Sequence, residues 1–222
     1  MFCAEFTFFV NQRRGIVVDI RDGKGLMDSS DNSLIRAHLM GEQAAFSELV
    51  RRHGDGLLGY LLRTTGNRQA AEDLFQETFR RVHEKAETFN GNNFRAWLYA
   101  IATNLTINEW RKRKRRPEMS LEQITECRDG GCWPLDTIAA TDEMSEPSQA
   151  AQREELKSQV RSAVATLPAK QRLTLIMAYY QHMSYAEIAA ALGCSTGAVK
   201  THMFRALKRL GRVLPNVPGG VL

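Results

Sequence analysis

The segment from Ser184 to Leu210 predicts two short helices around a tight turn, and the outer face of the second helix suits DNA bases. At 100° per residue, four apolar residues of this helix fall within roughly 40° of one another, which predicts a buried stripe: Val199, Met203, Ala206 and Leu210. The opposite side carries hydrogen-bond donors, cations and one apolar ring: Lys200, Thr201, Phe204, Arg205 and Lys208. An exposed Phe among cations costs solvation free energy unless it meets a partner such as a thymine methyl group.

The ends of both helices carry capping residues. Ser184 and Glu187 have the spacing of a capping box, Gly193 is placed to end the first helix, and Ser195 is placed to cap the second. This pattern is typical of a helix-turn-helix, whose second helix enters the DNA major groove with its N-terminal half against the bases. The alternative is an ordinary helical hairpin with a solvated basic face.

A second candidate nucleic-acid surface spans Phe94 to Arg116. It combines Trp97, Tyr99 and Trp110 with an unbroken run of cations from residue 111 to residue 116. Rings and cations on one helix suit nucleic acid with partly unstacked bases. The polar loop from Asn90 to Asn93, just before this helix, offers donors and acceptors for the edge of a flipped base. Alternatively, the rings belong to the core and the run is a solvated helix end.

A third surface lies on the predicted helix that begins near Ala71. Asp73 and Glu77 share one face at i, i+4, but no histidine or third acid converges with them in the sequence, and Glu77 with Arg81 forms an ordinary intrahelical pair. A docking face for a protein partner is therefore favoured over a metal site or a catalytic pair. The chain also has no glycine-rich phosphate loop and no nucleophile elbow, so we expect no cofactor, no metal and no catalysis.

These surfaces lie on a chain that we expect to be all-α. Apolar residues keep a helical period over 32–116, with breaks at Gly41, Gly54–Gly56, Gly66–Asn67 and Asn90–Asn93. We expect two small helical domains joined by a flexible acidic linker. The expected divisions are an N-terminal extension over 1–26, a helical bundle over 27–116, a linker over 117–152, a helix-turn-helix bundle over 153–212 and a tail over 213–222.

Charge is segregated along the chain, although the net charge is only +5. Residues 156–222 hold nine Lys and Arg but one acid, whereas residues 118–155 hold ten acids and two Arg. This predicts a basic module that meets a polyanion and an acidic connector that avoids it. The four cysteines lack paired zinc spacing, which fits a reduced cytoplasmic setting, with a metal or redox role for Cys127 and Cys132 as the alternative.

The sequence shows neither a membrane-spanning segment nor a signal peptide. No apolar stretch reaches the length of a membrane span, so we expect no direct membrane insertion. Residues 1–26 lack a basic start before a long apolar run and lack a cleavage site, so they do not resemble a signal peptide. We interpret them as a dispensable extension or the product of an upstream start codon.

Four motifs give the chain a resemblance to a known family. They are Ala71-Glu-Asp-Leu-Phe-Gln-Glu-Thr-Phe, Phe94-Arg-Ala-Trp-Leu-Tyr-Ala-Ile-Ala-Thr-Asn, Leu167-Pro-Ala-Lys-Gln-Arg, and Tyr185-Ala-Glu-Ile-Ala followed by Val199-Lys-Thr-His-Met-Phe-Arg-Ala. The chain resembles a bacterial RNA polymerase sigma factor of the extracytoplasmic-function (ECF) group over roughly 32–116 and 154–210. The short minus-10 loop and the position of His202, about 60° from Val199, depart from the pattern.

The resemblance implies a role for each surface. Residues 27–116 would be sigma region 2 and residues 153–212 sigma region 4, with core RNA polymerase (clamp and flap regions), promoter DNA and an anti-sigma factor as partners. Docking to the polymerase clamp would fall to Asp73, Gln76, Glu77 and Arg80. Opening the minus-10 element would fall to Asn90, Asn92, Asn93, Phe94, Arg95, Trp97, Asn104, Arg111, Lys112, Arg113, Arg115 and Arg116. Contacts with the minus-35 element would fall to Thr196, Lys200, Thr201, His202, Phe204, Arg205 and Lys208.

Two other functions remain open at the level of sequence. A stand-alone helix-turn-helix regulator explains the C-terminal module equally well, but leaves the basic aromatic helix and the acidic linker without a role. A DNA-processing enzyme requires a convergent carboxylate or nucleophile site, and the sequence shows none.

Overall fold

The computed structural model describes the backbone of residues 29–115 and 147–214, and the side chains of residues 29–113 and 155–214. Within those ranges every regular element is helical, which confirms the all-α prediction. The expectations for the N-terminal extension, the linker residues 117–146, the two cysteines within it and Arg116 lie outside the described residues, as does the side chain of Arg115.

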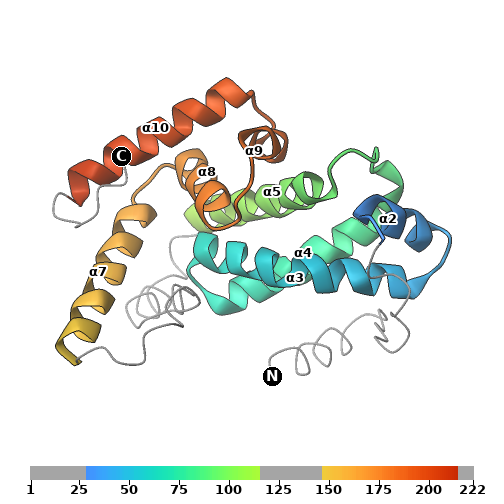
Figure 1. Cartoon of the computed structure of the whole chain (residues 1–222), viewed down its shortest axis with the longest axis horizontal. Coiled ribbons are helices and arrows are strands. Elements are labelled where there is room, and N and C mark those ends of the chain that lie inside the picture. Colours follow the sequence, from blue (N-terminus) through green and yellow to red (C-terminus); the bar gives the residue numbers. More distant parts are fainter. Residues whose placement is uncertain (1–28, 116–146, 215–222) are drawn as a thin grey trace.

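The N-terminal helices form one bundle (Figure 1). It comprises α2 (Asp31–Leu39), α3 (Gln43–Thr65), α4 (Arg68–Glu84), the 3-10 turn η2 (Ala86–Thr88) and α5 (Phe94–Arg115). Local signals set their ends. Ser30 caps α2 by accepting from the backbone N–H of Ser33, and Asn67 caps α4 by accepting from that of Ala70. Gly66 ends α3 with a φ of 67°.

The expected break at Gly54–Gly56 is wrong, because α3 continues through it. Each glycine costs a helix about 1 kcal/mol relative to alanine. Burial of Leu49, Leu57 and Leu61 on the same helix outweighs that cost. A Cβ at Gly54 would lie 3.6 Å from the ring of Phe75, so the glycine sits where α4 packs closely.

The C-terminal helices are α7 (Pro147–Ala165), α8 (Ala169–Tyr179), α9 (Tyr185–Leu192) and α10 (Thr196–Val213). Helix α10 packs on both α8 and α9, which fixes the orientation of its outer face. Between α8 and α9 the chain turns through Gln181 and His182, and His182 adopts a φ of 49°, a region that non-glycine residues seldom occupy.

The two groups of helices pack against each other. Figure 1 shows α8 and α9 beside α5, and the principal contacts between the groups join α5 to α9 and α3 to α8. Buried residues from both groups, including Leu98 of α5 and Ile188 of α9, belong to one hydrophobic cluster. The sequence predicted two tethered domains but gave no indication of this contact.

Candidate nucleic-acid interface

The helix-turn-helix has the local geometry that its sequence predicts. The Oγ of Ser184 accepts from the backbone N–H of Glu187 at 3.2 Å, and a carboxylate oxygen of Glu187 accepts from the backbone N–H of Ser184 at 2.8 Å. This completes the capping box. Gly193 ends α9 with a φ of 60°, and Ser195 caps α10 through the N–H of Ala198. These caps fix the turn that orients α10.

Helix α10 separates its apolar and basic sides as expected. Val199 and Ala206 are fully buried, and Met203 and Leu210 are partly buried. Phe204 is 66% exposed, so its ring is available to a partner. The other predicted minus-35 residues that are exposed are Thr196, Lys200, Thr201, Arg205 and Lys208.

His202 lies at the edge of this face and is partly buried. Burial, with the positive charges of Lys170 and Arg205, lowers the pKa of its imidazole below the ordinary value. A neutral imidazole retains one donor and one acceptor, so His202 adds hydrogen-bonding capacity to the face more than it adds charge.

Hydrogen bonds anchor the Asn90–Asn93 loop at two points, Gly91 and Asn93. The side-chain amide of Asn32 donates to the carbonyl of Gly91 at 2.6 Å, which anchors the loop to α2. Asn93 caps α5 by accepting from the N–H of Ala96 at 2.9 Å. Asn90 and Asn92 are exposed. The loop therefore holds two amides toward solvent on a fixed base.

The aromatic side chains of α5 pack mainly in the hydrophobic core or against it. Phe94 is 2% exposed, and its ring centroid lies 5.9 Å from that of Phe89 and 6.0 Å from that of Trp97. Phe94 therefore supports the loop from beneath and presents no ring face to a base in this conformation. Trp97 is partly buried and Tyr99 is 2% exposed. Asn104 is exposed farther along the helix.

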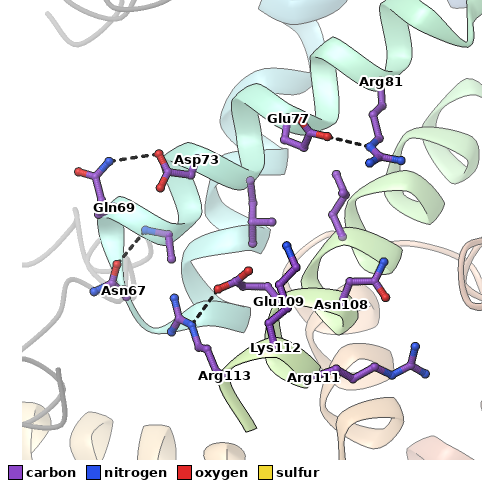
Figure 2. Close-up of a pocket in the computed structure, with 13 residues that line it drawn as sticks. Asn67, Gln69, Asp73, Glu77, Arg81, Asn108, Glu109, Arg111, Lys112 and Arg113 are labelled. Carbon is purple, nitrogen blue, oxygen red and sulfur yellow. Dashed lines mark hydrogen bonds and ion pairs between the residues drawn. The ribbon is translucent and has the colours of Figure 1, made fainter. Parts of the chain in front are cut away.

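The third surface faces a groove of about 930 Å³ between α4 and the end of α5. Figure 2 shows Asp73 and Glu77 on one side of this groove and Asn108, Glu109 and Arg111 on the other. Asp73 and Gln76 are exposed, and Glu77 is partly buried. From the sequence, the acidic face of α4 and the cationic run at the end of α5 were predicted as two separate surfaces. In the fold they form opposite walls of one groove.

Ion pairs join several charged side chains of that groove and lower the pKa of one of its carboxyl groups. Nε of Arg81 donates to Glu77 at 2.9 Å, which confirms the intrahelical pair, and Arg80 also binds Glu77. Hydrogen bonds from Arg80, more than from Arg81, lower the pKa of the Glu77 carboxyl to about 2. Arg113 pairs with Glu109 at 3.2 Å, while Arg111 and Lys112 are exposed.

Sequence reasoning missed Gln181 and the contacts that join α5 to the C-terminal helices. Gln181 accepts from the hydroxyl of Tyr99 at 2.6 Å, and its carbonyl accepts from Arg95. Asn93 donates to the Glu187 carboxylate at 3.1 Å. These partners lie more than 80 residues apart in the chain, so no local pattern could have indicated them.

Within the described residues, no cluster of three or more potential metal ligands occurs. No helix in that part of the chain is both long and apolar enough to cross a bilayer.

Two family models match separate parts of the chain. Residues 49–116 match the family model of sigma-70 region 2, and residues 157–210 match that of sigma-70 region 4. Over 190 residues the chain is 30% identical to RNA polymerase sigma-H factor of Pseudomonas aeruginosa, covering 85% of this chain and 96% of that protein. The chain belongs to the ECF group of RNA polymerase sigma factors.

Other sigma factors show similar likeness. The ECF sigma factor SigW of Bacillus subtilis is 32% identical over 175 residues, which cover 78% of this chain and 91% of SigW. Among solved structures, CnrH in complex with the cytosolic domain of CnrY has a TM-score of 0.58 and 26% identity, covering 83% of this sigma factor and 97% of CnrH. RpoE from Bartonella quintana, solved with the anti-sigma factor NepR, shares the fold at a TM-score of 0.54, 24% identity and coverage of 77% of this chain and 97% of RpoE.

Proposed function

We propose that this sigma factor binds core RNA polymerase and directs it to promoters, with region 4 contacting the minus-35 element and region 2 opening the minus-10 element. The observation that carries the proposal is the presence of both sigma-70 regions in the expected order, each with an exposed surface of matching chemistry. A stand-alone regulator would account for α10 but not for region 2.

Region 4 would contact bases through the exposed face of α10. Arg205 and Lys200 supply the donors that pair with guanine edges, and Phe204 supplies an apolar surface for a thymine methyl group. Both cations are exposed, and Gly193 and Ser195 fix the turn before the helix. The fixed turn would present the N-terminal half of α10 to the groove, as in other helix-turn-helix proteins.

Region 2 would contact the opened strand through the Asn90–Asn93 loop and the exposed side of α5. Asn90 and Asn92 offer donors and acceptors to an extruded base. Arg111, Lys112 and Arg113 would neutralise neighbouring phosphates, together with Arg115 and Arg116 beyond them. Phe94 would contribute by supporting the loop, in keeping with its burial.

The polymerase would dock on α4. Asp73, Gln76, Glu77 and Arg80 form a mixed acidic and basic surface beside the groove, and such surfaces favour partner specificity and rapid association.

We further propose that an anti-sigma factor holds the chain inactive, as members of this group are found with such partners. The polymerase would make the RNA, this chain would supply no catalysis of its own, and the complex would act in the cytoplasm.

Reconstituted transcription tests the proposal. The purified chain is added to core polymerase on a template that carries candidate promoters and on a matched template with scrambled minus-35 and minus-10 elements. Start-site-specific transcripts from the first template alone are expected. A chain that binds duplex DNA by itself but yields no transcripts with the polymerase would be a stand-alone regulator.

A further inference from the structure

The peptide unit that joins Gly91 to Asn92, in the middle of the Asn90–Asn93 loop, is held from both sides. Its carbonyl accepts from the side-chain amide of Asn32 at 2.6 Å, and its N–H donates to the side-chain oxygen of Asn90 at 3.3 Å. We infer that Asn32 is a positioning residue, which sets the direction of the Asn92 side chain and thereby the choice of minus-10 base. The inference rests on the proposed function, because it concerns base selection by the same loop.

Backbone freedom at Gly91 is the reason why this peptide unit needs an anchor. Gly91 adopts a φ of 78°, and glycine enters this left-handed region about as readily as the right-handed one. The peptide unit is planar, so a rotation beside the glycine would move its carbonyl and its N–H together. A Cβ at Gly91 would meet no atom within 4 Å, so packing does not restrict this position. Hydrogen bonds therefore fix the orientation of the unit.

Asn32 is itself held on a firmly placed helix. It lies in the first turn of α2, which Ser30 caps, and Leu34 and Ile35 of the same helix are buried in the core. Helix α2 also contacts η2, the turn that leads into the loop. Asn32 and Gly91 are 59 residues apart in the chain, so the bond ties the loop to a separate and rigid element.

The base of the loop is fixed from the same side of the bundle. A hydrogen bond with His53 lowers the pKa of the Asp31 carboxyl, and an ionised carboxylate can only accept, so Nε2 of His53 donates to it at 2.8 Å. The imidazole packs against Phe94, with ring centroids 5.1 Å apart. Phe94 in turn packs edge to face on Phe89, and these two rings flank the loop in sequence. With both ends held, the central peptide unit is the part that Asn32 controls.

Asn92 is the side chain whose direction this peptide unit decides. It is exposed, and its amide carries both donors and an acceptor, so its direction determines which base edge it can pair with. The side-chain oxygen of Asn90 already accepts a bond within the loop. Without Asn32 the unit would be free to rotate, and Asn92 would occupy several directions before it met a base. A contact that must first be ordered contributes less to affinity and to selection.

Base discrimination by the holoenzyme tests the inference. Each variant is assembled with core polymerase and bound to a promoter fragment that the wild-type chain transcribes, and to fragments in which each minus-10 base is replaced in turn. At one position, Asn32→Ala should reduce the affinity ratio between the preferred and the replaced base by roughly fivefold, as for the loss of one hydrogen bond. A loss of folded protein would weaken binding of every fragment alike and would leave that ratio unchanged.

A second variant, Asn32→Asp, guards against a folding defect. An acid in the first turn of a helix is favoured by the helix dipole, so α2 should keep its stability, but an ionised carboxylate cannot donate to the Gly91 carbonyl. Asn32→Asp should therefore lose discrimination as Asn32→Ala does. The matched control is Gln43→Ala, which truncates an exposed amide at the start of α3 and should retain the discrimination of the wild type.

The possible outcomes separate this inference from the proposed function. The same discrimination in both Asn32 variants as in Gln43→Ala would overturn the inference. A wild-type holoenzyme that transcribes from the promoter but prefers no base within its minus-10 element would overturn it as well. If the wild-type chain gives no promoter-specific transcript with core polymerase, the proposed function itself fails, and the inference fails with it.

Discussion

The carboxylate of Glu77 accepts two hydrogen bonds from the guanidinium of Arg80, at 2.6 and 2.7 Å. Two parallel bonds fix the relative orientation of the groups as well as joining them. Glu77 therefore reaches the surface of α4 as part of an ordered acid-base pair. Asp73, one turn earlier, is exposed and is bonded by Gln69 at 3.2 Å. The α4 surface thus offers a partner one exposed acid and one ion-paired acid.

Replacing Asp73 and Glu77 together by alanine should weaken the affinity for core polymerase. Each substitution should cost roughly 1 kcal/mol of binding free energy or less and should mainly slow association, as is usual for charges at the rim of an interface. Competition binding against the wild-type chain measures the effect. Glu72→Ala, which breaks the pair with Arg68 on the same helix, is the control. An affinity equal to that of the control would place the docking surface elsewhere.

Arg205→Ala should weaken recognition of the minus-35 element by about 1–3 kcal/mol, the usual worth of a good base contact. The measurement compares binding of the holoenzyme to the preferred element and to variants with one base changed. Arg209→Ala removes an exposed cation of the same helix and is the control. A uniform loss on every sequence would show that Arg205 contacts only phosphate.

Acid should destabilise the region 2 bundle through Glu48. Hydrogen bonds from Arg51, with those from Arg52, lower the pKa of the Glu48 carboxyl from an ordinary 4.5 to about 2. The unfolded chain therefore binds a proton first, so the free energy of unfolding should fall as pH drops from about 4.5 toward 2. Denaturant titrations at several pH values measure this slope.

The comparison for that experiment is Glu48→Gln, which removes the titrating group. Its unfolding free energy should start lower than that of the wild type near neutral pH and should decline less steeply below pH 4.5. Glu77, whose pKa also lies at about 2, titrates in the same range and keeps the slope above zero. An unchanged slope in Glu48→Gln would contradict the assignment.

Tyr60→Phe should destabilise region 2 by about 1–3 kcal/mol, the cost of leaving a buried polar group without its partner. The Tyr60 hydroxyl lies 2.8 Å from Oγ1 of Thr103, and both residues are buried. Burial raises the pKa of the Tyr60 hydroxyl, so it stays protonated at ordinary pH. Thermal unfolding of the variant checks the loss, with the 58% exposed Tyr179 changed to Phe as control. Equal stability of both variants would refute the role of this bond.

The sequence by itself determined the helices and most of their ends. Ser184, Glu187, Gly193 and Ser195 act on backbone groups within a few residues, so their patterns predicted the caps that the structure has. The apolar stripe of α10 likewise follows from helical period alone. The family motifs were visible for the same reason, since each is contained within one or two neighbouring helices.

Only the tertiary structure decided which of those residues face solvent, which face the core and which meet across the chain. It made α3 continuous through Gly54, because packing outweighed glycine's low helix propensity, and it buried the ring of Phe94, which was expected to contact the minus-10 element. It also joined Tyr99 to Gln181 across 82 residues. Such contacts depend on how whole helices fill space against one another, and no local spacing of residue types encodes that.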